Sequence, residues 1–296
     1  MVHPAMLHIK LIIMSLIWAT SYPLGRWLAA YGAPEAIVVS RVFIAFLFLC
    51  LMAKVRNESP MSLSIPLVLQ FFVLGFFGFC VHNYLMFEAL EHTQAGKGAI
   101  INGAIPAIVM LLDFLVFRRR IGMLSFLGVG LSFFGVLVVV SDGRFVNLLY
   151  FGLGRGEILF LVAILGWSLY SIIARPLLEL YRPIWVTAYP CLCGAILMLP
   201  FLFANLEAAI AILSEPFVVF ILLVQGILTM GLGFLWYYEG IKYLGPVNTS
   251  VYLNLVPVFG VTLAFFAVDE IPSFSVFVGG GAVVAGVWLT TRKVTV

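Results

Sequence analysis

Five ionisable residues of this 296-residue chain lie inside or beside long apolar segments, where charge is costly. Glu88, Asp113, Glu239 and His82 are of types that bind and release protons, and Arg41 could anchor a carboxylate or a cluster of carbonyl oxygens. A charge at the centre of a bilayer costs about 2.5–3.5 kcal/mol on insertion scales, so such residues usually face a partner or water. Plainer roles stay open for each: solvated positions near helix ends for the glutamates, a local ion pair for the aspartate, one structural hydrogen bond for the histidine and helix-end packing for the arginine.

Aromatic residues recur at helical spacing and define candidate faces of a binding cavity. Trp18 and Tyr22 are one helical turn apart, and Trp167 follows at the matching place in a later apolar segment. Trp236 shares a predicted helical face with other polar residues, and Tyr84 lies on a weaker counterpart of that face. Because Trp and Tyr also form belts at the membrane surface, an interfacial role is the alternative for those near helix ends.

Two Asn–Pro pairs lie inside apolar segments. Asn102 precedes Pro106 by four residues, and Asn254 precedes Pro257 by three. A proline inside a helix leaves a backbone carbonyl without its hydrogen-bond donor, which only a protein interior or a water-lined cavity tolerates. We expect both kinks to flank a substrate site, with static kinks that only improve packing as the alternative.

Common catalytic motifs are missing from the sequence. It has no G-x-x-x-x-G-K-[ST] nucleotide loop, no H-E-x-x-H zinc site and no G-x-S-x-G nucleophile elbow. The three aspartates, Asp113, Asp142 and Asp269, form no paired-carboxylate site inside a segment. We therefore predict that the chain is not an enzyme and needs no cofactor and no metal, and that its four cysteines pack as small apolar side chains.

Composition predicts an all-α integral membrane protein. Hydrophobic residues make up 64% of the chain and charged residues 10%, against roughly 45–50% and about 25% in soluble domains. A membrane-spanning helix needs about 20 apolar residues. Ten such segments are predicted, at residues 8–30, 35–53, 66–90, 96–117, 122–140, 156–178, 183–204, 215–241, 247–268 and 273–291.

Basic residues predict the orientation in the membrane. With the N-terminus in the cytoplasm, eleven of the sixteen Lys and Arg residues fall on or near the cytoplasmic side, as loops rich in these residues prefer. Both termini are then cytoplasmic, in the plasma membrane, which is the inner membrane of a bacterium. The net charge of +3 reflects this asymmetry, and we expect no nucleic-acid partner.

The second half of the chain repeats the first. At an offset of 151 residues the matches include Glu88 with Glu239, Pro106 with Pro257 and Gly135 with Gly286, and at an offset of 149 Trp18 matches Trp167. Arg118-Arg119 meets Asp269-Glu270, so the charge of one turn is reversed between the copies. A basic and an acidic turn indicate opposite sides of the membrane. We predict two inverted five-helix repeats, residues 1–145 and 150–296, with a site at the midplane between them.

These residues also resemble a known family. Trp18, Arg41, the segment Ala89–Pro106 (ALEHTQAGKGAIINGAIP) and its partner Gly240–Pro257 (GIKYLGPVNTSVYLNLVP), each followed by a Gly-rich final helix, are similar to the drug/metabolite transporter superfamily, in particular its EamA-type branch. The resemblance covers essentially the whole chain and implies a membrane transporter, without identifying the substrate. The acidic residue that usually opens the last helical hairpin is present at Glu270, whereas its counterpart in the first copy is Arg119.

We therefore expect a secondary transporter that exports a small polar or amphipathic metabolite, an amino acid or a derivative, by alternating access. A membrane channel or facilitator, or a membrane scaffold with no transport role, is the alternative. Without a nucleotide site, a gradient or the solute itself must drive transport, and protons are a candidate coupling ion. The residues expected to line the cavity are Trp18, Tyr22, Arg41, Tyr84, Asn102, Pro106, Trp167, Trp236, Asn254 and Pro257, and those expected to couple are Glu239, Glu88, Asp113 and His82.

Overall fold

The computed structural model describes residues 4–118, 122–144, 154–268 and 271–291, and all regular structure within them is helical. The first half contains α1 (Pro4–Ala19), α2 (Ser21–Ala29), α3 (Pro34–Val55), α4 (Ile65–Gly75), η1 (Phe76–Tyr84), α5 (Leu85–His92), α6 (Ala95–Asn102), α7 (Ile105–Phe117) and α8 (Met123–Val140). The second half contains α10 (Arg155–Leu180), α11 (Pro183–Ala204), α12 (Leu206–Leu213), α13 (Pro216–Gln225), η2 (Gly226–Gly233), α14 (Phe234–Leu244), α15 (Pro246–Ser250), η3 (Val251–Asn254), α16 (Leu255–Val268) and α17 (Phe274–Thr291).

The helices are those of a multi-pass membrane protein, which confirms the predicted class. Eight helical segments of the described residues are long and apolar enough to cross a bilayer, and two shorter apolar helices, Phe126–Val139 and Phe274–Gly286, coincide with the fifth and tenth predicted segments. Large apolar side chains point outward from these helices; Phe266 and Phe274, for example, are 77% and 82% exposed. Such an outer surface suits lipid, since a bilayer solvates apolar groups and requires backbone polar groups to be paired within the helices.

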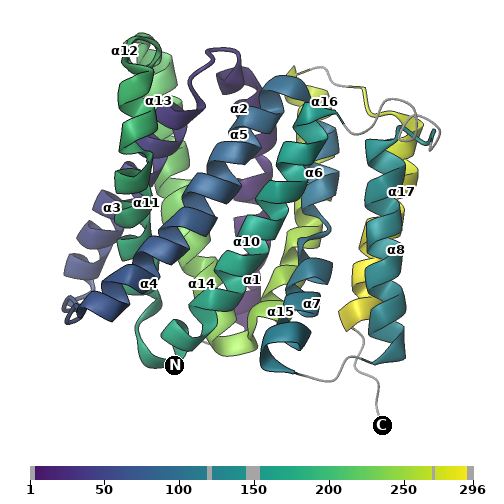
Figure 1. Cartoon of the computed structure of the whole chain (residues 1–296), viewed down its shortest axis with the longest axis horizontal. Helices are drawn as coiled ribbons and strands as arrows, with labels where there is room; N and C mark the ends of the chain where they lie inside the picture. The colour runs from purple at the N-terminus through teal and green to yellow at the C-terminus, as the bar shows by residue number, and fades with distance from the viewer. Residues whose placement is uncertain (1–3, 119–121, 145–153, 269–270, 292–296) are drawn as a thin grey trace.

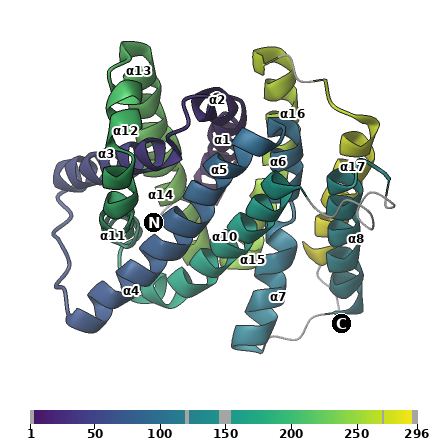
Figure 2. The ribbon, with the colours of Figure 1, turned by 45° about the horizontal axis from the view of Figure 1, so that its top comes forward.

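The two halves pack against each other through matching helices. In Figures 1 and 2, α8 and α17, the last helices of the two halves, lie side by side. The second helices, α3 and α11, are also in contact, as are α6 and α16 from the fourth and ninth spans. The contact of α10 with η1 and α5 is matched by that of α1 with η2 and α14. Each contact therefore has its counterpart when the halves are exchanged, as expected from two copies related by a pseudo-twofold axis.

Glycines allow α8 and α17 to approach closely. A Cβ atom at Gly135 would lie 2.5 Å from the carbonyl oxygen of Gly279, and one at Gly286 would lie 2.5 Å from that of Gly128. Side chains cannot occupy such space, so the small residues are required for this contact within the chain. Gly281, also on α17, faces open space instead.

The third and eighth spans each contain a π-helical stretch in the same place. η1 begins at Phe76, and η2 begins at Gly226, 150 positions later. π-Helical turns are rare and are concentrated at functional sites, and they rotate the residues that follow relative to a continuous α-helix. Sequence periodicity did not predict either stretch.

The fourth and ninth spans are interrupted at the predicted Asn–Pro pairs. α6 ends at Asn102, and α7 restarts at Ile105 with Pro106 in its first turn. In the ninth span the 3₁₀ turn η3 ends at Asn254, and Pro257 lies in the first turn of α16. The two interruptions meet, because a Cβ at Gly103 would lie 2.8 Å from the Pro257 ring. The fourth span is broken by two turn residues between α-helices and the ninth by a change to a 3₁₀ turn, rather than by the simple kinks that we expected.

The first described helix begins and the last one ends on the same side of the bundle, as an even number of membrane passes requires. Figure 1 shows that α1 begins and α17 ends at the same, lower end of the bundle. The charge-reversed turns cannot be compared in the structure, since Arg119, Asp269 and Glu270 lie outside the described residues.

Candidate functional site

A small cavity lies between the two halves, at the level where the broken and π-helical segments meet. It offers about 40 Å³ to the centres of water molecules, room for roughly three at about 10–15 Å³ each. Its walls combine aromatic, amide, imidazole and guanidinium groups: Trp18, Ser21, Tyr22, Arg41, His82, Asn83, Met86, Asn102, Trp167, Met230, Phe234, Leu253 and Val256. A pocket with an apolar lining and a few convergent polar groups is typical of a small-molecule site.

Half of the residues predicted for the cavity are in its wall. Trp18 and Tyr22 come from the first span, Arg41 from α3, Asn102 from the end of α6 and Trp167 from α10. Their elements belong to both halves of the chain, which is why no single helical face could show the whole site. His82, which the sequence singled out for proton coupling, also lines the cavity.

Arg41 is fully buried and ties α3 to the π-helical turn η2. Its Nη2 donates a hydrogen bond to the Oγ1 of Thr229 over 2.9 Å and a longer one to the Oγ of Ser21 over 3.5 Å. The guanidinium carbon lies 4.7 Å from the centre of the Phe87 ring, a cation–π contact that partly compensates for lost hydration. Its Nε and Nη1 have no hydrogen-bond partner.

The imidazole of His82 is fixed by a hydrogen bond to the opposite helix. Its Nδ1 lies 3.0 Å from the carbonyl oxygen of Ala163 on α10, and its ring centre lies 4.8 Å from that of Trp167. Because a carbonyl can only accept, Nδ1 carries the proton, and a neutral ring then leaves Nε2 as an acceptor. The cavity therefore holds a fixed imidazole that can accept one more proton.

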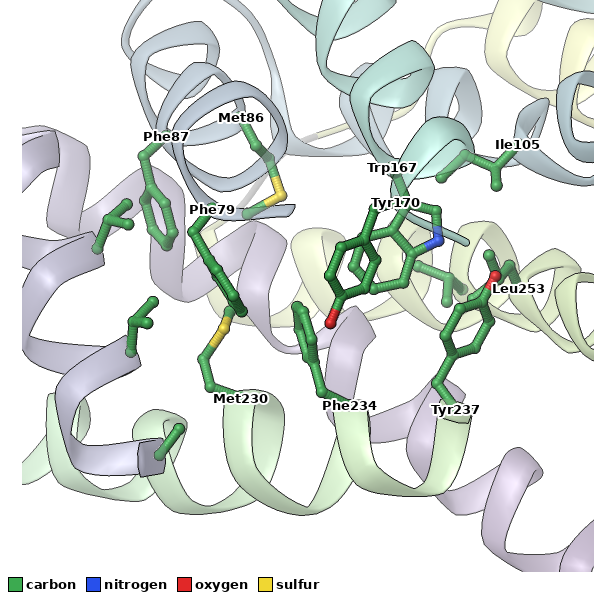
Figure 3. Close-up of a cluster of buried hydrophobic side chains, with 14 of the residues drawn as sticks. Phe79, Met86, Phe87, Ile105, Trp167, Tyr170, Met230, Phe234, Tyr237 and Leu253 are labelled. Carbon is green, nitrogen blue, oxygen red and sulfur yellow. The ribbon is translucent and has the colours of Figure 1, made fainter. Parts of the chain in front are cut away.

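A layer of aromatic rings closes the cavity on one side. Trp18 and Trp167 meet edge to face with ring centres 5.1 Å apart, and Phe234 lies 5.6 and 5.0 Å from them. Figure 3 shows Trp167 and Tyr170 pointing toward Phe234 and Tyr237 of the facing helix. The Tyr237 hydroxyl shares a 2.9 Å hydrogen bond with Ser171. Each edge-to-face contact contributes about 0.5–1.5 kcal/mol beyond the burial of the rings. The aromatic layer is therefore a stable wall of the cavity.

Beyond this aromatic layer, ion pairs join the two halves. Lys10 of α1 lies 2.6 Å from Glu239 of α14, and Arg175 of α10 lies 3.0 Å from Asp113 of α7. The first of these pairs is largely shielded, with side chains 19% and 10% exposed. The hydroxyl of Ser15 donates to the backbone carbonyl of Tyr252 over 2.7 Å.

Another set of contacts joins the two halves at the opposite end of the cavity. The ring of Tyr22 stacks on that of Phe160, with centres 6.4 Å apart. Farther out, Arg155 at the start of α10 forms an ion pair with Glu88 of α5, and Arg26 donates to the backbone carbonyl of Leu90. The pair Arg155–Glu88 is the counterpart of Lys10–Glu239, since α1 matches α10 and Glu88 matches Glu239.

The other predicted cavity residues lie outside this lining in the part of the chain that the structure describes. Tyr84 lies in a groove at the edge of the bundle, with its ring 6.1 Å from that of Phe201. Trp236, on α14, is half-buried and packs against the hydrophobic core. Pro106 and Asn254 lie within the helix breaks. Pro257 lies on the wall of a wider apolar groove between α16 and α17.

Irregular helices explain the residues that sequence periodicity missed. An unbroken α-helix through the eighth span would place Trp236 on the face of Thr229, but the π turns of η2 rotate Phe234 and Met230 toward the cavity instead. In the third span, η1 likewise turns Asn83 and Met86 inward and leaves Tyr84 outside. The missing signal is the position of the π-helical turns.

One group of side chains at the Glu88 end has the composition of a metal site. The ligand atoms of Glu88, Glu91 and His92 lie within 4.8 Å of one another. Glu88 is, however, already paired with Arg155, and the His92 side chain is exposed. We assign no ion to this group.

Comparison with known proteins gives the family. The model of the EamA-like transporter family matches twice, over residues 6–141 and 154–292, one match for each half. The chain belongs to this family. It is 30% identical over 97% of both lengths to an uncharacterized transporter of Archaeoglobus fulgidus and 25% identical to the uncharacterized transporter YyaM of Bacillus subtilis, over 95% of this chain and 92% of YyaM.

Two further likenesses concern function and fold. A probable terminal-alkyne amino-acid exporter of Streptantibioticus cattleyicolor is 23% identical over 96% of this chain and 92% of the exporter. A solved crystal structure superimposes with a TM-score of 0.67, at 17% identity and over 95% of both chains, which shows the shared fold alone. The chain is therefore a multi-pass membrane protein of a transporter family, built from two family repeats.

Proposed function

We propose that this protein is a secondary transporter that exports a small polar or amphipathic metabolite, an amino acid or a derivative, by alternating access. The observation that carries the proposal is the cavity between the two halves, with contacts between the halves on either side of it. Tyr22–Phe160 and Arg155–Glu88 close one end, and the Trp18–Trp167 layer and Lys10–Glu239 close the other. Alternating access requires such a pair of closures, of which one opens while the other holds.

The size of the cavity supports a moving transporter rather than a fixed pore. Space for roughly three water molecules is too little for an amino acid. One closure must therefore loosen before a solute of this size enters. The interrupted fourth and ninth spans, which touch each other at Gly103 and Pro257, supply a place where each half can bend.

Charge and one relative support a direction of transport and a location for the protein. In our proposal ten spans form two inverted repeats, in the bacterial inner membrane, with both termini in the cytoplasm and with the Lys10–Glu239 end facing the cytoplasm. This orientation places most Lys and Arg residues on the cytoplasmic side. Export of an amino-acid derivative is supported by the printed name of the Streptantibioticus relative.

Protons are the coupling ion in this proposal, and His82 is the residue best placed to carry them. Of the four candidates, His82 lines the cavity, whereas Glu88, Glu239 and Asp113 are held in ion pairs at the two ends. A proton on His82 would change the charge that a bound solute meets. This links solute binding to proton binding at one site.

Solute exchange in proteoliposomes tests the proposal. The full chain is reconstituted, the vesicles are loaded with one unlabelled amino acid at a time, and entry of the labelled form is followed. We expect saturable exchange whose rate falls about tenfold in Trp18→Ala and is kept in Phe220→Ala, a matched loss of a ring on the outer surface. Flux that neither saturates nor exchanges would identify a channel, and no flux with any solute would favour a scaffold.

A further inference from the structure

The charge of Arg41 has no anionic partner in the described part of the chain. Its hydrogen-bond acceptors are the hydroxyls of Thr229 and Ser21, and its other contact is the face of Phe87. The ion pairs of the described residues use other basic groups, such as Lys10, and no carboxylate among those residues lies within ion-pair distance of Arg41. A buried charge is strongly unfavourable unless it is paired, so this arrangement is incomplete without an anion.

The unused donors of Arg41 are on the guanidinium group that lines the cavity. Nε and Nη1 have no partner, while Nη2 carries both of the hydroxyl contacts. A guanidinium binds the two oxygens of a carboxylate through a planar fork of Nη2 with Nε or of Nη2 with Nη1. Each unused donor of Arg41 therefore forms a fork with the second N–H of Nη2 once the long 3.5 Å contact to Ser21 is released. A hydroxyl or a backbone carbonyl would use one donor and leave the charge unbalanced.

The same cavity offers acceptors for a positive group. The Oδ1 of Asn102 is buried and has no hydrogen-bond partner. The Nε2 of a neutral His82 is a second acceptor, since Nδ1 donates to Ala163. Trp18, Met230 and Phe234 supply the apolar part of the wall. The wall therefore contains one cationic donor group, two neutral acceptors and an apolar surface.

We infer that Arg41 binds the carboxylate of the transported solute and that the solute is a zwitterion, with its ammonium group at Asn102 and its apolar side chain against the aromatic wall. This inference rests on the proposed function and specifies the substrate class of the same cavity. The site occurs in one copy only, because the residue matching Arg41 in the second half, at an offset of 149, is Pro190. The cavity thus has one guanidinium group that can bind a carboxylate.

Paired ligands test the inference in the unmodified protein. Exchange of each proteinogenic L-amino acid is compared with inhibition by its α-amide, which keeps the ammonium group and side chain and lacks the carboxylate. We expect half-maximal inhibition by the amide at a concentration about tenfold or more above that of the acid, because a charge-assisted contact is lost. Equal inhibition by acid and amide would overturn the role of Arg41 while leaving transport intact.

Variants of Arg41 test whether this residue is responsible for the preference for the acid over its amide. Arg41→Gln should raise the half-saturating concentration of the acid about tenfold and change that of the amide little, so the discrimination disappears. Arg41→Lys keeps the positive charge but lacks the planar fork of donors, so it should recover part of the discrimination between acid and amide. Arg182→Gln, at an exposed arginine, is the control for loss of a positive charge. Unchanged discrimination in a folded Arg41→Gln protein would also overturn the inference.

The outcomes separate this inference from the proposed function. If no amino acid exchanges in the wild-type protein, the proposed function fails, and the inference falls with it. If exchange occurs without discrimination between acid and amide, only the inference fails. Should Arg41→Gln not fold, the comparison of acid with amide in the wild-type protein still decides, since it needs no variant.

Discussion

Trp18 and Trp167 occupy matching positions in the two halves and meet edge to face, with ring centres 5.1 Å apart. The indole Nε1 of Trp18 donates a 2.8 Å hydrogen bond to the backbone carbonyl of Thr229, in the π-helical turn η2. The Trp18 ring thus contacts both the partner tryptophan and the backbone of the π-helical segment η2. We propose that the contact between Trp18 and Trp167 is the centre of the closure on the cytoplasmic side of the cavity.

Removing either ring should slow transport strongly. Trp18→Ala and Trp167→Ala each leave a gap in the aromatic layer next to Phe234, and we expect the exchange rate to fall about tenfold, the equivalent of roughly 1.4 kcal/mol. Trp18→Phe should retain more activity, since it restores an edge-to-face ring but not the hydrogen bond to Thr229. Rates are compared at equal amounts of reconstituted protein. Wild-type exchange in both alanine variants would remove the pair from the mechanism.

The two end ion pairs should bias the protein in opposite directions. A cysteine at Met230 in a protein without its native cysteines reports access to the cavity from either side. Lys10→Gln should raise labelling from the cytoplasmic side, and Arg155→Gln should raise it from outside, each by about two- to fivefold. The effect of Arg155→Gln should be the smaller and more salt-sensitive, since Arg155 is 67% exposed and Lys10 only 19%. Increased labelling from one and the same side in both variants would contradict the alternating arrangement.

The helix breaks are expected to matter for movement more than for insertion. Pro106→Ala provides an N–H group for the Asn102 carbonyl, which would favour one continuous helix through the break between α6 and α7. We expect the exchange rate to fall several-fold with normal membrane levels, and Pro257→Ala to behave alike. Pro183→Ala is the control, because this proline begins α11, where a missing N–H has no cost. Unchanged rates in both variants would make the breaks packing features only.

Orientation has a direct test. In the protein without native cysteines, a cysteine at Arg182, between α10 and α11, should react with a membrane-impermeant reagent from the cytoplasm. One at Arg144, after α8, should react from outside. A permeant reagent should label both and serves as the control for reactivity. Labelling of both from one side would rule out the proposed orientation.

The sequence predicted what depends on periodicity and on repetition. Composition was sufficient for a helical membrane protein, and the offset of 149 residues paired Trp18 with Trp167, which do meet. Burial of Arg41 followed from its place deep in an apolar segment. Each of these features is local to one helix or is copied between the halves, so a linear pattern is enough to find it.

The sequence did not predict what depends on irregular helices and on contacts between distant segments. Trp236 was placed on a face with Thr229 by assuming α-helical spacing across η2, and the π turns invalidate that spacing. The basic partners of Glu88 and Glu239, Arg155 and Lys10, are 67 and 229 positions away. No local pattern records such pairings, because they arise only when the two halves pack.

The last prediction concerns the response to a pH gradient. His82 lies in the cavity wall with Nδ1 fixed on Ala163, so a proton taken up at Nε2 would be felt by a bound solute. His82→Gln keeps a hydrogen-bonding group but cannot carry the proton. We expect it to abolish accumulation driven by a pH gradient and to leave exchange at equal pH on both sides within about twofold of wild type, since binding and movement survive when only the linkage is lost. His8→Gln, near the membrane surface on α1, is the matched control.

The same measurement ranks the alternative carriers. Glu88→Gln, Glu239→Gln and Asp113→Asn each break an ion pair at one end, so we expect them to change the rate at equal pH while the response to the gradient persists. If Glu239→Gln abolished the response to the pH gradient and His82→Gln kept it, the coupling role would belong to the Lys10–Glu239 ion pair. Retention in all four variants would exclude proton coupling through these side chains, and exchange or facilitated diffusion would become the mechanism.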